Sequence, residues 1–197
     1  MDLIVIRHAR PERQEVTEGA ADPPLTPLGQ QMAQATAEFL APESVDHIVA
    51  STMVRARETA APLVDALSLP LETRHDLIEV DAHSGEYIPA EEIKDNPEYL
   101  AKFQDDPMQI FEGDYDGFRD RVVAGFDEVI AANRGRTVAV YCHGMVITVY
   151  LRSILNFSSP FDLLIDYCGI SRIQASSTGL RSVRSINETA HVRDLLP

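Results

Sequence analysis

The sequence predicts an α/β fold, a three-layer sandwich in which helices flank a mostly parallel central sheet and one edge strand is antiparallel. Short apolar, β-branched runs at 3–6, 47–50 and 137–142 alternate with longer stretches of helical periodicity. The runs "LIVI" and "VAVY" are continuously apolar, which is typical of central strands covered on both faces. Near the carboxyl end, the runs at 169–176 and 180–187 predict a hairpin at one edge of the sheet.

The first helix is predicted over residues 26–40, "TPLGQQMAQATAEFL", whose apolar side chains recur at near-helical spacing. Thr26 is a suitable cap for its amino end. Pro27 suits the first helical position, because the N–H that proline lacks would have no partner in the helix there. This helix follows the first strand and begins the α/β alternation.

The second helix is predicted over residues 51–67, directly after the second strand. Ser51 or Thr52 is expected to cap it, and Pro62 is expected to kink or break it. Its first turn carries Arg55, which places a cation close to the end of a strand.

Residues 80–117 differ in character from the rest of the chain. They are acidic, contain three prolines and show mixed short helical patterns, such as "AEEIKDNPEYLAKF" at 90–103. We interpret this segment as an insertion over the edge or mouth of the sheet. Regular helical periodicity returns at 115–133 and again at 144–155, after the third strand.

Length and charge narrow the class of protein. The 197 residues are expected to form a single domain over 1–197 that includes the acidic insertion at about 80–117. Seventeen Lys and Arg against thirty-one Asp and Glu give a formal net charge of -14. Nucleic acids and anionic membranes bind basic surfaces, so neither is expected as a partner. Arginines that cluster at one place are therefore informative.

The cysteines and the apolar segments indicate the cellular compartment of the protein. Cys142 and Cys168 are too few for a disulfide framework and favour a reducing compartment. The sequence shows neither the long apolar run of a membrane span nor the pattern of a secretory signal. A cytoplasmic location is therefore expected, with Cys142 buried on a core strand.

Polar side chains follow the predicted strands, where open α/β sheets bind their ligands. Arg7 and His8 follow the first strand and Arg55 follows the second, while Glu79 comes after the short "LETR" run and His143 after the third strand. Phosphate suits this set, because guanidinium groups and helix N-termini bind it and imidazole can attack phosphorus. The sequence therefore predicts a phosphate pocket.

Other routes to phosphoryl transfer lack their signatures. A cysteine phosphatase needs arginine six residues after its cysteine, where this chain has Thr148 after Cys142 and Gln174 after Cys168. "DYDG" at 114–117 precedes a helix and is interpreted as a cap rather than as an aspartyl-phosphate motif. Walker, HExxH and paired-cysteine motifs are absent from the sequence, so no metal or cofactor is expected.

By elimination, His8 becomes the candidate nucleophile. A neutral imidazole can attack phosphorus when a hydrogen bond fixes its other nitrogen. Arg7 and Arg55 would neutralise the phosphoryl oxygens, and His143 would donate to them as charge develops. Glu79 is the candidate that protonates the leaving alkoxide and later deprotonates a water molecule.

The motifs "IRHARP", "PLTPLGQQMA", "STMVRARETA", "LIEVD" and "VYCHG" occur in this order over residues 4–144. Together they resemble the histidine phosphatase superfamily, the phosphoglycerate mutase-like proteins. In that family the first His is phosphorylated, two Arg and a late His bind the phosphate, and a middle Glu transfers protons. The resemblance also implies an α/β sandwich and a site without metal. It assigns these roles to His8, Arg7, Arg55, His143 and Glu79.

The chain departs from the family pattern at two places. Ala9 stands where the family usually has the glycine of Arg-His-Gly, a mild change unless the backbone there needs a positive φ. Around Glu79, both Asp81 and Glu86 are alternative candidates for the proton-transfer role.

Three functions are compatible with these residues. The first is a metal-independent phosphomonoester hydrolase of the histidine acid phosphatase type, acting through phospho-His8 on a small-molecule phosphoester or a phosphoprotein. The second is a phosphoglycerate mutase, ranked lower because mutases of the family usually have longer chains. The third is a non-catalytic phospholigand-binding or scaffold domain. Arg10 and Arg13 would contact either substrate or solvent, and Arg57 is expected on the surface.

Overall fold

The computed structural model describes residues 1–94, 97, 101 and 105–197. Its centre is a six-stranded sheet with the strand order β4-β3-β6-β1-β7-β8. The central strands β1, β3 and β6 coincide with the three apolar runs that predicted them. The strands of this sheet are β1 (Asp2–Arg7), β3 (His47–Ser51), β4 (Leu71–Arg74), β6 (Thr137–Cys142), β7 (Ile170–Ala175) and β8 (Arg181–Glu188).

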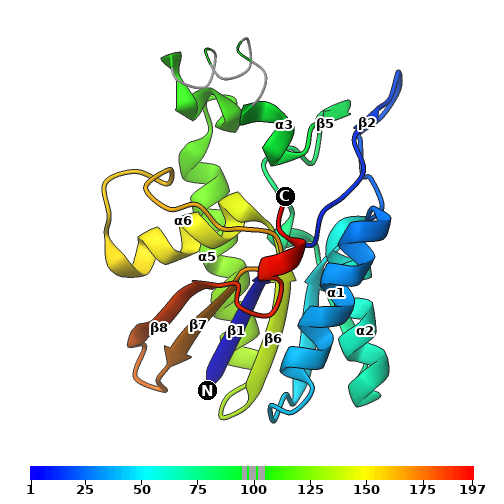
Figure 1. Ribbon diagram of the computed structural model, residues 1–197. Coiled ribbons are helices and arrows are strands. Elements are labelled where there is room, and N and C mark those ends of the chain that lie inside the picture. Colours follow the sequence, from blue (N-terminus) through cyan, green and yellow to red (C-terminus); the bar gives the residue numbers. More distant parts are fainter. Residues whose placement is uncertain (95–96, 98–100, 102–104) are drawn as a thin grey trace.

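The sheet is mostly parallel, as predicted. The strands β4, β3, β6 and β1 are mutually parallel, whereas β7 runs antiparallel to β1 and β8 antiparallel to β7. The antiparallel edge is thus a hairpin of two strands, in agreement with the pattern at 169–176 and 180–187. Because the parallel strands share a direction, their carboxyl ends meet at one edge of the sheet (Figure 1).

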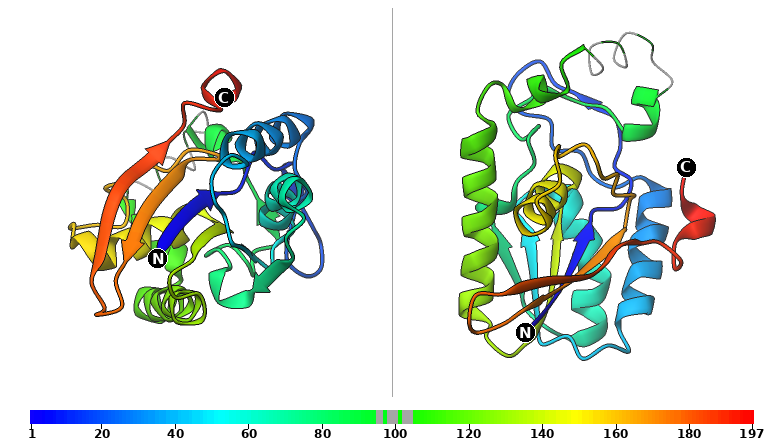
Figure 2. Two further views of the ribbon diagram at one scale, coloured as in Figure 1. Left: turned by 90° about the horizontal axis from the view of Figure 1, so that it is seen from below. Right: turned by 90° about the vertical axis from the view of Figure 1, so that its left-hand side faces the viewer.

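Helices cover both faces of the sheet and complete the three layers (Figure 2). On one face, α5 and α6 pack against Leu3 and Val5 of β1, and on the other, α1 and α2 pack against Ile4 and Ile6. Successive strand residues point to opposite faces, so an unbroken apolar run is what a strand between two helical layers requires. The four helices are α1 (Pro27–Leu40), α2 (Val54–Leu67), α5 (Tyr115–Ala132) and α6 (Gly144–Leu155).

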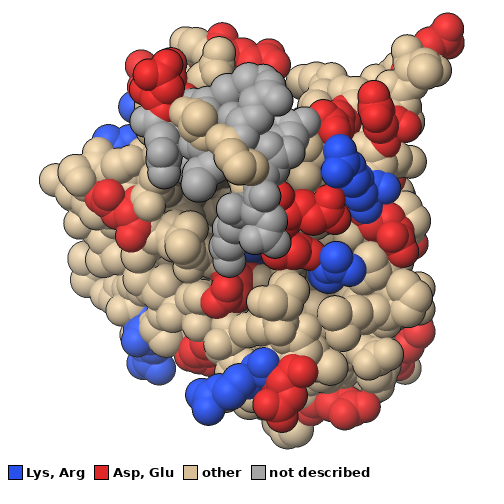
Figure 3. Space-filling model, turned by 45° about the horizontal axis from the view of Figure 1, so that its top comes forward, with Lys and Arg blue, Asp and Glu red and all other residues tan. Residues whose placement is uncertain are grey.

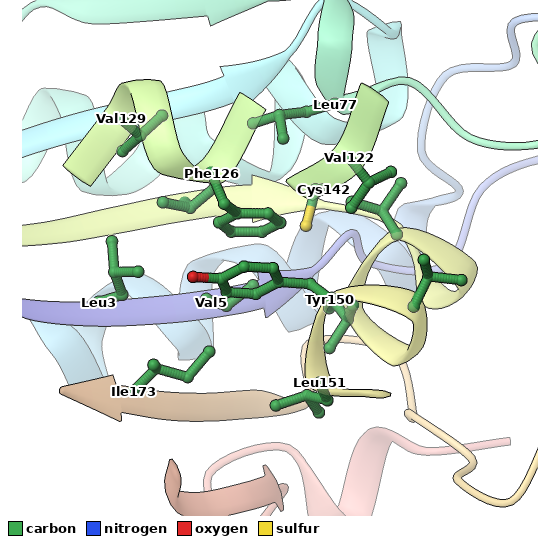
Figure 4. Close-up of a cluster of buried hydrophobic side chains, with 14 of the residues drawn as sticks. Leu3, Val5, Leu77, Val122, Phe126, Val129, Cys142, Tyr150, Leu151 and Ile173 are labelled. Atoms are coloured by element: carbon green, nitrogen blue, oxygen red, sulfur yellow. The ribbon is translucent and has the colours of Figure 1, made fainter. Parts of the chain in front are cut away.

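The core between the sheet and α5 and α6 is aromatic at its centre (Figure 4). The rings of Phe126 and Tyr150 stack with centroids 3.9 Å apart and planes 9° apart, which joins α5 to α6. Cys142 is fully buried in the same cluster, as its place on a core strand predicts. This packing fixes the carboxyl end of β6, and with it the residue that follows.

The predicted N-cap residue is correct for α1 and wrong for α2. Thr26 caps α1 by accepting a hydrogen bond from the Gly29 N–H at 2.9 Å, as expected. The prediction that Ser51 or Thr52 caps α2 is wrong, because the N-cap position is Met53. The Asp22 carboxylate, from a distant segment, accepts the Val54 N–H at 3.0 and 3.1 Å instead.

Pro62 neither ends nor breaks α2. The helix runs without interruption from Val54 to Leu67 and contains Pro62 in its interior. Of the two expected effects, a kink or a break, the break is therefore wrong and the kink stays a prediction; α2 continues with Leu63 buried against the sheet.

Several short elements lie over the carboxyl ends of the parallel strands (Figure 1). They belong to the segment after β1, to the turn after β4 and to the acidic segment 80–117, and part of the helical pattern predicted at 90–103 falls outside the described residues. Asp and Glu side chains are prominent on this end of the molecule (Figure 3). The elements are β2 (Gln14–Glu15), which pairs with β5 (Glu86–Tyr87), α3 (Ala90–Lys94) and the 3-10 turns η1 (His75–Leu77) and η2 (Pro107–Phe111); a third turn, η3 (Arg193–Leu195), lies near the carboxyl end of the chain.

Candidate active site

Two histidines lie side by side at the carboxyl edge of the sheet. Because β1 and β6 pair in parallel with Arg7 opposite Cys142, the residues that follow, His8 and His143, are neighbours. The His8 N–H donates to the Cys142 carbonyl at 2.9 Å, which extends the strand pairing by one step. The two imidazole rings have centroids 5.2 Å apart and planes inclined by 58°.

The protonation of His8 follows from its hydrogen bond. Its Nδ1 lies 2.8 Å from the Ala9 carbonyl oxygen, which can only accept, so Nδ1 carries the proton and Nε2 carries the lone pair. Burial lowers the pKa of His8 well below its usual value, and the charges of Arg55 and Arg7 lower it further. The ring is therefore neutral with a free lone pair, which is the form that can act as a nucleophile.

Ala9 fits the site without a glycine. Its φ is not positive, so the methyl group imposes no backbone strain. The side chain is fully buried, and the Ala9 N–H donates to Thr59 Oγ1 of α2 at 2.9 Å. The residue thus orients His8 through its carbonyl while it is itself held by α2.

Two guanidinium groups flank the histidines. Arg55, in the first turn of α2, is fully buried, and its Nη2 donates to the Asp81 carboxylate at 2.7 Å. Arg7 Nη1 donates to the Ile165 carbonyl at 2.6 Å. Nε of both side chains and Nη1 of Arg55 are buried without a hydrogen-bond partner among the described residues. Buried charged donors require acceptors, so the arrangement favours an anion between these groups.

His143 lies at the N-cap position of α6 and does not cap the helix with its side chain. It is fully buried, and both ring nitrogens are unpartnered within the described part of the chain. Burial lowers its pKa well below the usual value, followed by the charges of Arg55 and of His8. We call Arg7, His8, Arg55 and His143 together the polar floor.

Glu79 lies at the side of the polar floor, with both oxygens oriented by backbone N–H groups. Oε1 accepts from Val80 and Oε2 from Met145, each at 2.9 Å. Burial, and then the charge of Asp81, raise the pKa of Glu79 to about 7. A carboxyl group with such a pKa can donate and accept a proton near neutral pH.

The other predicted candidates are held in ion pairs. Asp81 is bound to Arg55, and Arg10 Nε donates to Glu91 of α3. Arg13 donates to Glu86 and to Glu92, at 3.1 and 3.2 Å. Asp81 and Glu86 therefore both lie against arginines. Arg57 is exposed, as expected.

The structure adds three residues that the sequence did not single out. Tyr167 lies with its ring centroid 4.2 Å from the Arg7 guanidinium carbon, and the ring of Tyr87 lies 4.7 Å from that of Arg55. Arg121 of α5 donates from Nη1 to the carbonyls of Asp76 and Ile78, at 2.8 and 3.0 Å, directly before Glu79. None of the three follows a strand or belongs to a motif, so sequence position gave no signal for them.

A cavity of about 310 Å³ opens onto this constellation. Arg7, His8, Arg55, Glu79 and Asp81 are among the residues that line it, whereas His143 is not. A larger cavity of about 650 Å³ lies near Met1 and Leu180, at the opposite end of the sheet, but the histidines do not line it. Chemistry rather than size therefore identifies the candidate active site.

Two features are absent from the described residues, a metal-binding cluster and a membrane-spanning helix. No group of three or more His, Cys, Asp or Glu side chains within this part of the chain is arranged to hold a metal ion. Among the same residues, no helix has both the length and the apolar character needed to cross a bilayer.

Comparison with known sequences identifies the family. A family profile described as the histidine phosphatase superfamily (branch 1) matches residues 3–189, and the chain belongs to this family. A bifunctional protein of Mycobacterium tuberculosis is 29% identical over 96% of this chain, which spans about half (54%) of the length of that relative. The uncharacterized phosphatase PhoE of Bacillus subtilis is 28% identical over 77% of this chain and 76% of its own. The probable phosphoglycerate mutase GpmB of Yersinia enterocolitica is 24% identical over 98% of this chain and 95% of its own.

Solved structures share the fold. The phosphoserine phosphatase of Entamoeba histolytica in complex with 3-phosphoglyceric acid has a TM-score of 0.76 and 20% identity, over 97% of this chain and 98% of its own. A putative alpha-ribazole-5'-P phosphatase of Escherichia coli has a TM-score of 0.75 and 22% identity, over 96% and 98%. At these identities the likeness establishes the fold, which is the predicted α/β sandwich.

Proposed function

We propose that this protein is a metal-independent phosphomonoester hydrolase that acts through a phosphohistidine on His8. One observation carries the proposal: His8 is buried between two guanidinium groups with its Nδ1 proton bound to the Ala9 carbonyl. This bond leaves the Nε2 lone pair as the nucleophile in a site whose donors favour a phosphoryl group.

In the first step, Nε2 of His8 attacks phosphorus and the ester P–O bond breaks. Arg7, Arg55 and an N–H of His143 donate to the phosphoryl oxygens as negative charge develops on them. Glu79 is protonated in part near neutral pH, because its pKa is about 7, and it gives its proton to the leaving alkoxide. The products are an alcohol, a phosphohistidine and the Glu79 carboxylate.

In the second step, the Glu79 carboxylate removes a proton from water as the water oxygen attacks phosphorus. The P–N bond breaks, inorganic phosphate leaves, and both His8 and Glu79 return to their starting forms. All proton transfers are thus assigned to residues of this chain.

A mutase is the second candidate, favoured by the similarity to the probable phosphoglycerate mutase GpmB. The same phosphohistidine would return its phosphate to a second hydroxyl instead of to water. With 3-phosphoglycerate as substrate, release of inorganic phosphate supports the hydrolase, and retention of phosphate on the glycerate supports the mutase.

Trapping the phosphoenzyme tests the proposal. Rapid quenching with a radiolabelled phosphomonoester, followed by peptide mapping, should place an acid-labile label on His8. The variant His8→Ala should lose both the label and turnover, whereas the control His83→Ala, at an exposed histidine, should keep both. Labelling that survives in His8→Ala would overturn the assignment. Undetectable turnover of all phosphoesters, with binding competed by phosphate, would instead support a binding domain.

A further inference from the structure

Much of the lining of the cavity is apolar. Besides the charged residues it includes aliphatic and aromatic side chains from three separate segments: the stretch before and within α3, the first turn of α6, and the loop between α6 and β7. We call this set the apolar wall, and it comprises Ile88, Ile93, Met145, Phe161, Leu163 and Leu164.

We propose that the alcohol released by this enzyme is apolar, so that its substrates are phosphomonoesters of alkyl or aryl alcohols. The inference rests on the proposed hydrolase function and names the substrate class of the same site. The leaving group of an ester bound at the polar floor would extend along the apolar wall. Burial of its carbon atoms there would supply binding free energy.

The distribution of charge supports this substrate class. Among the described lining residues, the cations are Arg7 and Arg55, and both belong to the polar floor. Asp81 and Glu79 also line the cavity. A carboxylate on the leaving group would therefore meet acidic side chains and no additional cation among these residues.

The nearby arginines are already paired with acidic residues. Arg10, two positions after His8, donates to Glu91 of α3, and Glu91 also accepts the Tyr167 hydroxyl at 3.0 Å. Arg13 is bound to Glu92 as well as to Glu86. These ion pairs neutralise cations that would otherwise attract an acidic leaving group.

Leu164 provides a large apolar surface at the mouth of the cavity, with 82% of the residue exposed. The loop that carries it is well supported: Arg152 donates to the carbonyls of Phe157 and Ser158, and Asp162 accepts the Ser159 N–H at 2.9 Å. Because Leu164 lines the same cavity as His8, its apolar surface is placed to contact an apolar substrate.

A homologous series of esters tests the inference. Ethyl, butyl and hexyl phosphate release primary alcohols of nearly equal acidity, so differences in kcat/KM report on contacts with the chain. We expect kcat/KM to rise along the series by up to about fourfold for each methylene that becomes buried. Phosphoserine and 3-phosphoglycerate should be poorer substrates than butyl phosphate.

Substitutions at the mouth assign the effect to the apolar wall. In Leu164→Ala, the ratio of kcat/KM for hexyl over ethyl phosphate should fall by about fivefold, because roughly one kcal/mol of apolar contact is lost. Leu164→Arg should shift the preference toward 3-phosphoglycerate. The control Leu180→Ala, which truncates another exposed leucine at the distant hairpin, should leave the ratio unchanged.

The outcomes separate this inference from the function on which it rests. If His8 is labelled and ethyl phosphate is hydrolysed, but the series is flat or the carboxylate esters are preferred, the apolar leaving group is wrong and the hydrolase stands. If no ester is hydrolysed and no label forms on His8, both proposals are wrong.

Discussion

The polar floor and the apolar wall of the cavity are built from different kinds of structure. The floor residues end β1, follow β1 or β6, or lie in the first turn of α2, so the central sheet and its packed helices fix their positions. Most of the wall comes from α3, the stretch before it and the loop between α6 and β7, and Met145 in the first turn of α6 completes it. Under the proposed function, this difference predicts a division of roles, in which the sheet would fix the phosphate chemistry and the connecting segments would select the alcohol.

Replacing a floor residue should have the largest effect on turnover and little effect on stability. In Arg55→Met, kcat/KM should fall by about 1,000-fold, because a fully buried donor to the phosphoryl group is lost. The free energy of unfolding, measured in urea, should change little, because the loss of the Arg55–Asp81 ion pair is offset by the removal of a buried guanidinium with two unpartnered nitrogens.

Arg57→Met is the matched control for this substitution, because Arg57 lies on the same helix and is exposed. It should leave both kcat/KM and stability unchanged. A strongly destabilised Arg55→Met protein would show that the floor is part of the folding core, contrary to the division of roles.

In the proposed mechanism Glu79 protonates the leaving group, so the effect of replacing it should depend on pH and on the ester. Its pKa of about 7 means that the acid form is present below neutral pH and is lost above it. With an alkyl phosphate, kcat for phosphoenzyme formation should therefore fall as the pH rises through about 7. In Glu79→Gln this dependence should disappear and the rate should fall by about 100-fold.

The comparison ester for Glu79→Gln is p-nitrophenyl phosphate, whose leaving group needs little protonation. Phosphoenzyme formation from this ester should be affected much less. Equal losses with both esters would remove Glu79 from the acid role and favour Asp81 or Glu86 as its alternative.

Arg121 should act on the same step with a smaller effect, as a positioning residue. Its bonds to the Asp76 and Ile78 carbonyls hold the segment that leads to Glu79. Arg121→Met should lower turnover of alkyl phosphates by about tenfold and displace the pH dependence, with little change for p-nitrophenyl phosphate.

The matched control is Arg119→Met on the same helix, where the arginine is paired with Asp116 and Asp120 at the surface. It should leave turnover of both esters unchanged. If Arg121→Met slows both esters equally, its role is general stability rather than placement of Glu79.

Removing the ion pair between Arg10 and Glu91, beside the apolar wall, should have the smallest effect on activity. Glu91→Gln frees Arg10 from its carboxylate partner, so kcat/KM for 3-phosphoglycerate should rise by up to about fivefold relative to butyl phosphate. Glu92→Gln, which alters the pair of Arg13, is the matched control and should cause a smaller change. A fall in relative activity toward 3-phosphoglycerate would contradict the shielding of Arg10 by Glu91.

The sequence predicted the floor much better than the wall, for a physical reason. Parallel strands bring their carboxyl ends together, so His8 and His143 could be placed at one edge from their positions after apolar runs. The pairing of Arg10 with Glu91 depends on how a connecting segment folds over that edge, which no periodicity encodes.

The helix caps show the same limit. Thr26 caps its own helix through a contact three residues away and was predicted correctly. The N–H of Val54 is bound by Asp22, a residue from a different segment, and local sequence patterns predicted Ser51 or Thr52 instead. Tyr167 reaches Arg7 in a similar long-range way.

The pairing of β1 with β6 also has a consequence for how the protein acquires its site during folding. These strands are adjacent in the sheet but come from distant parts of the chain, so their contact forms only after a large loop has closed. His8 and His143 therefore meet only when the central sheet is nearly complete. A tightly bound oxyanion should bind only the fully folded protein. The increase that it causes in the free energy of unfolding would therefore report the fraction of molecules that are fully folded.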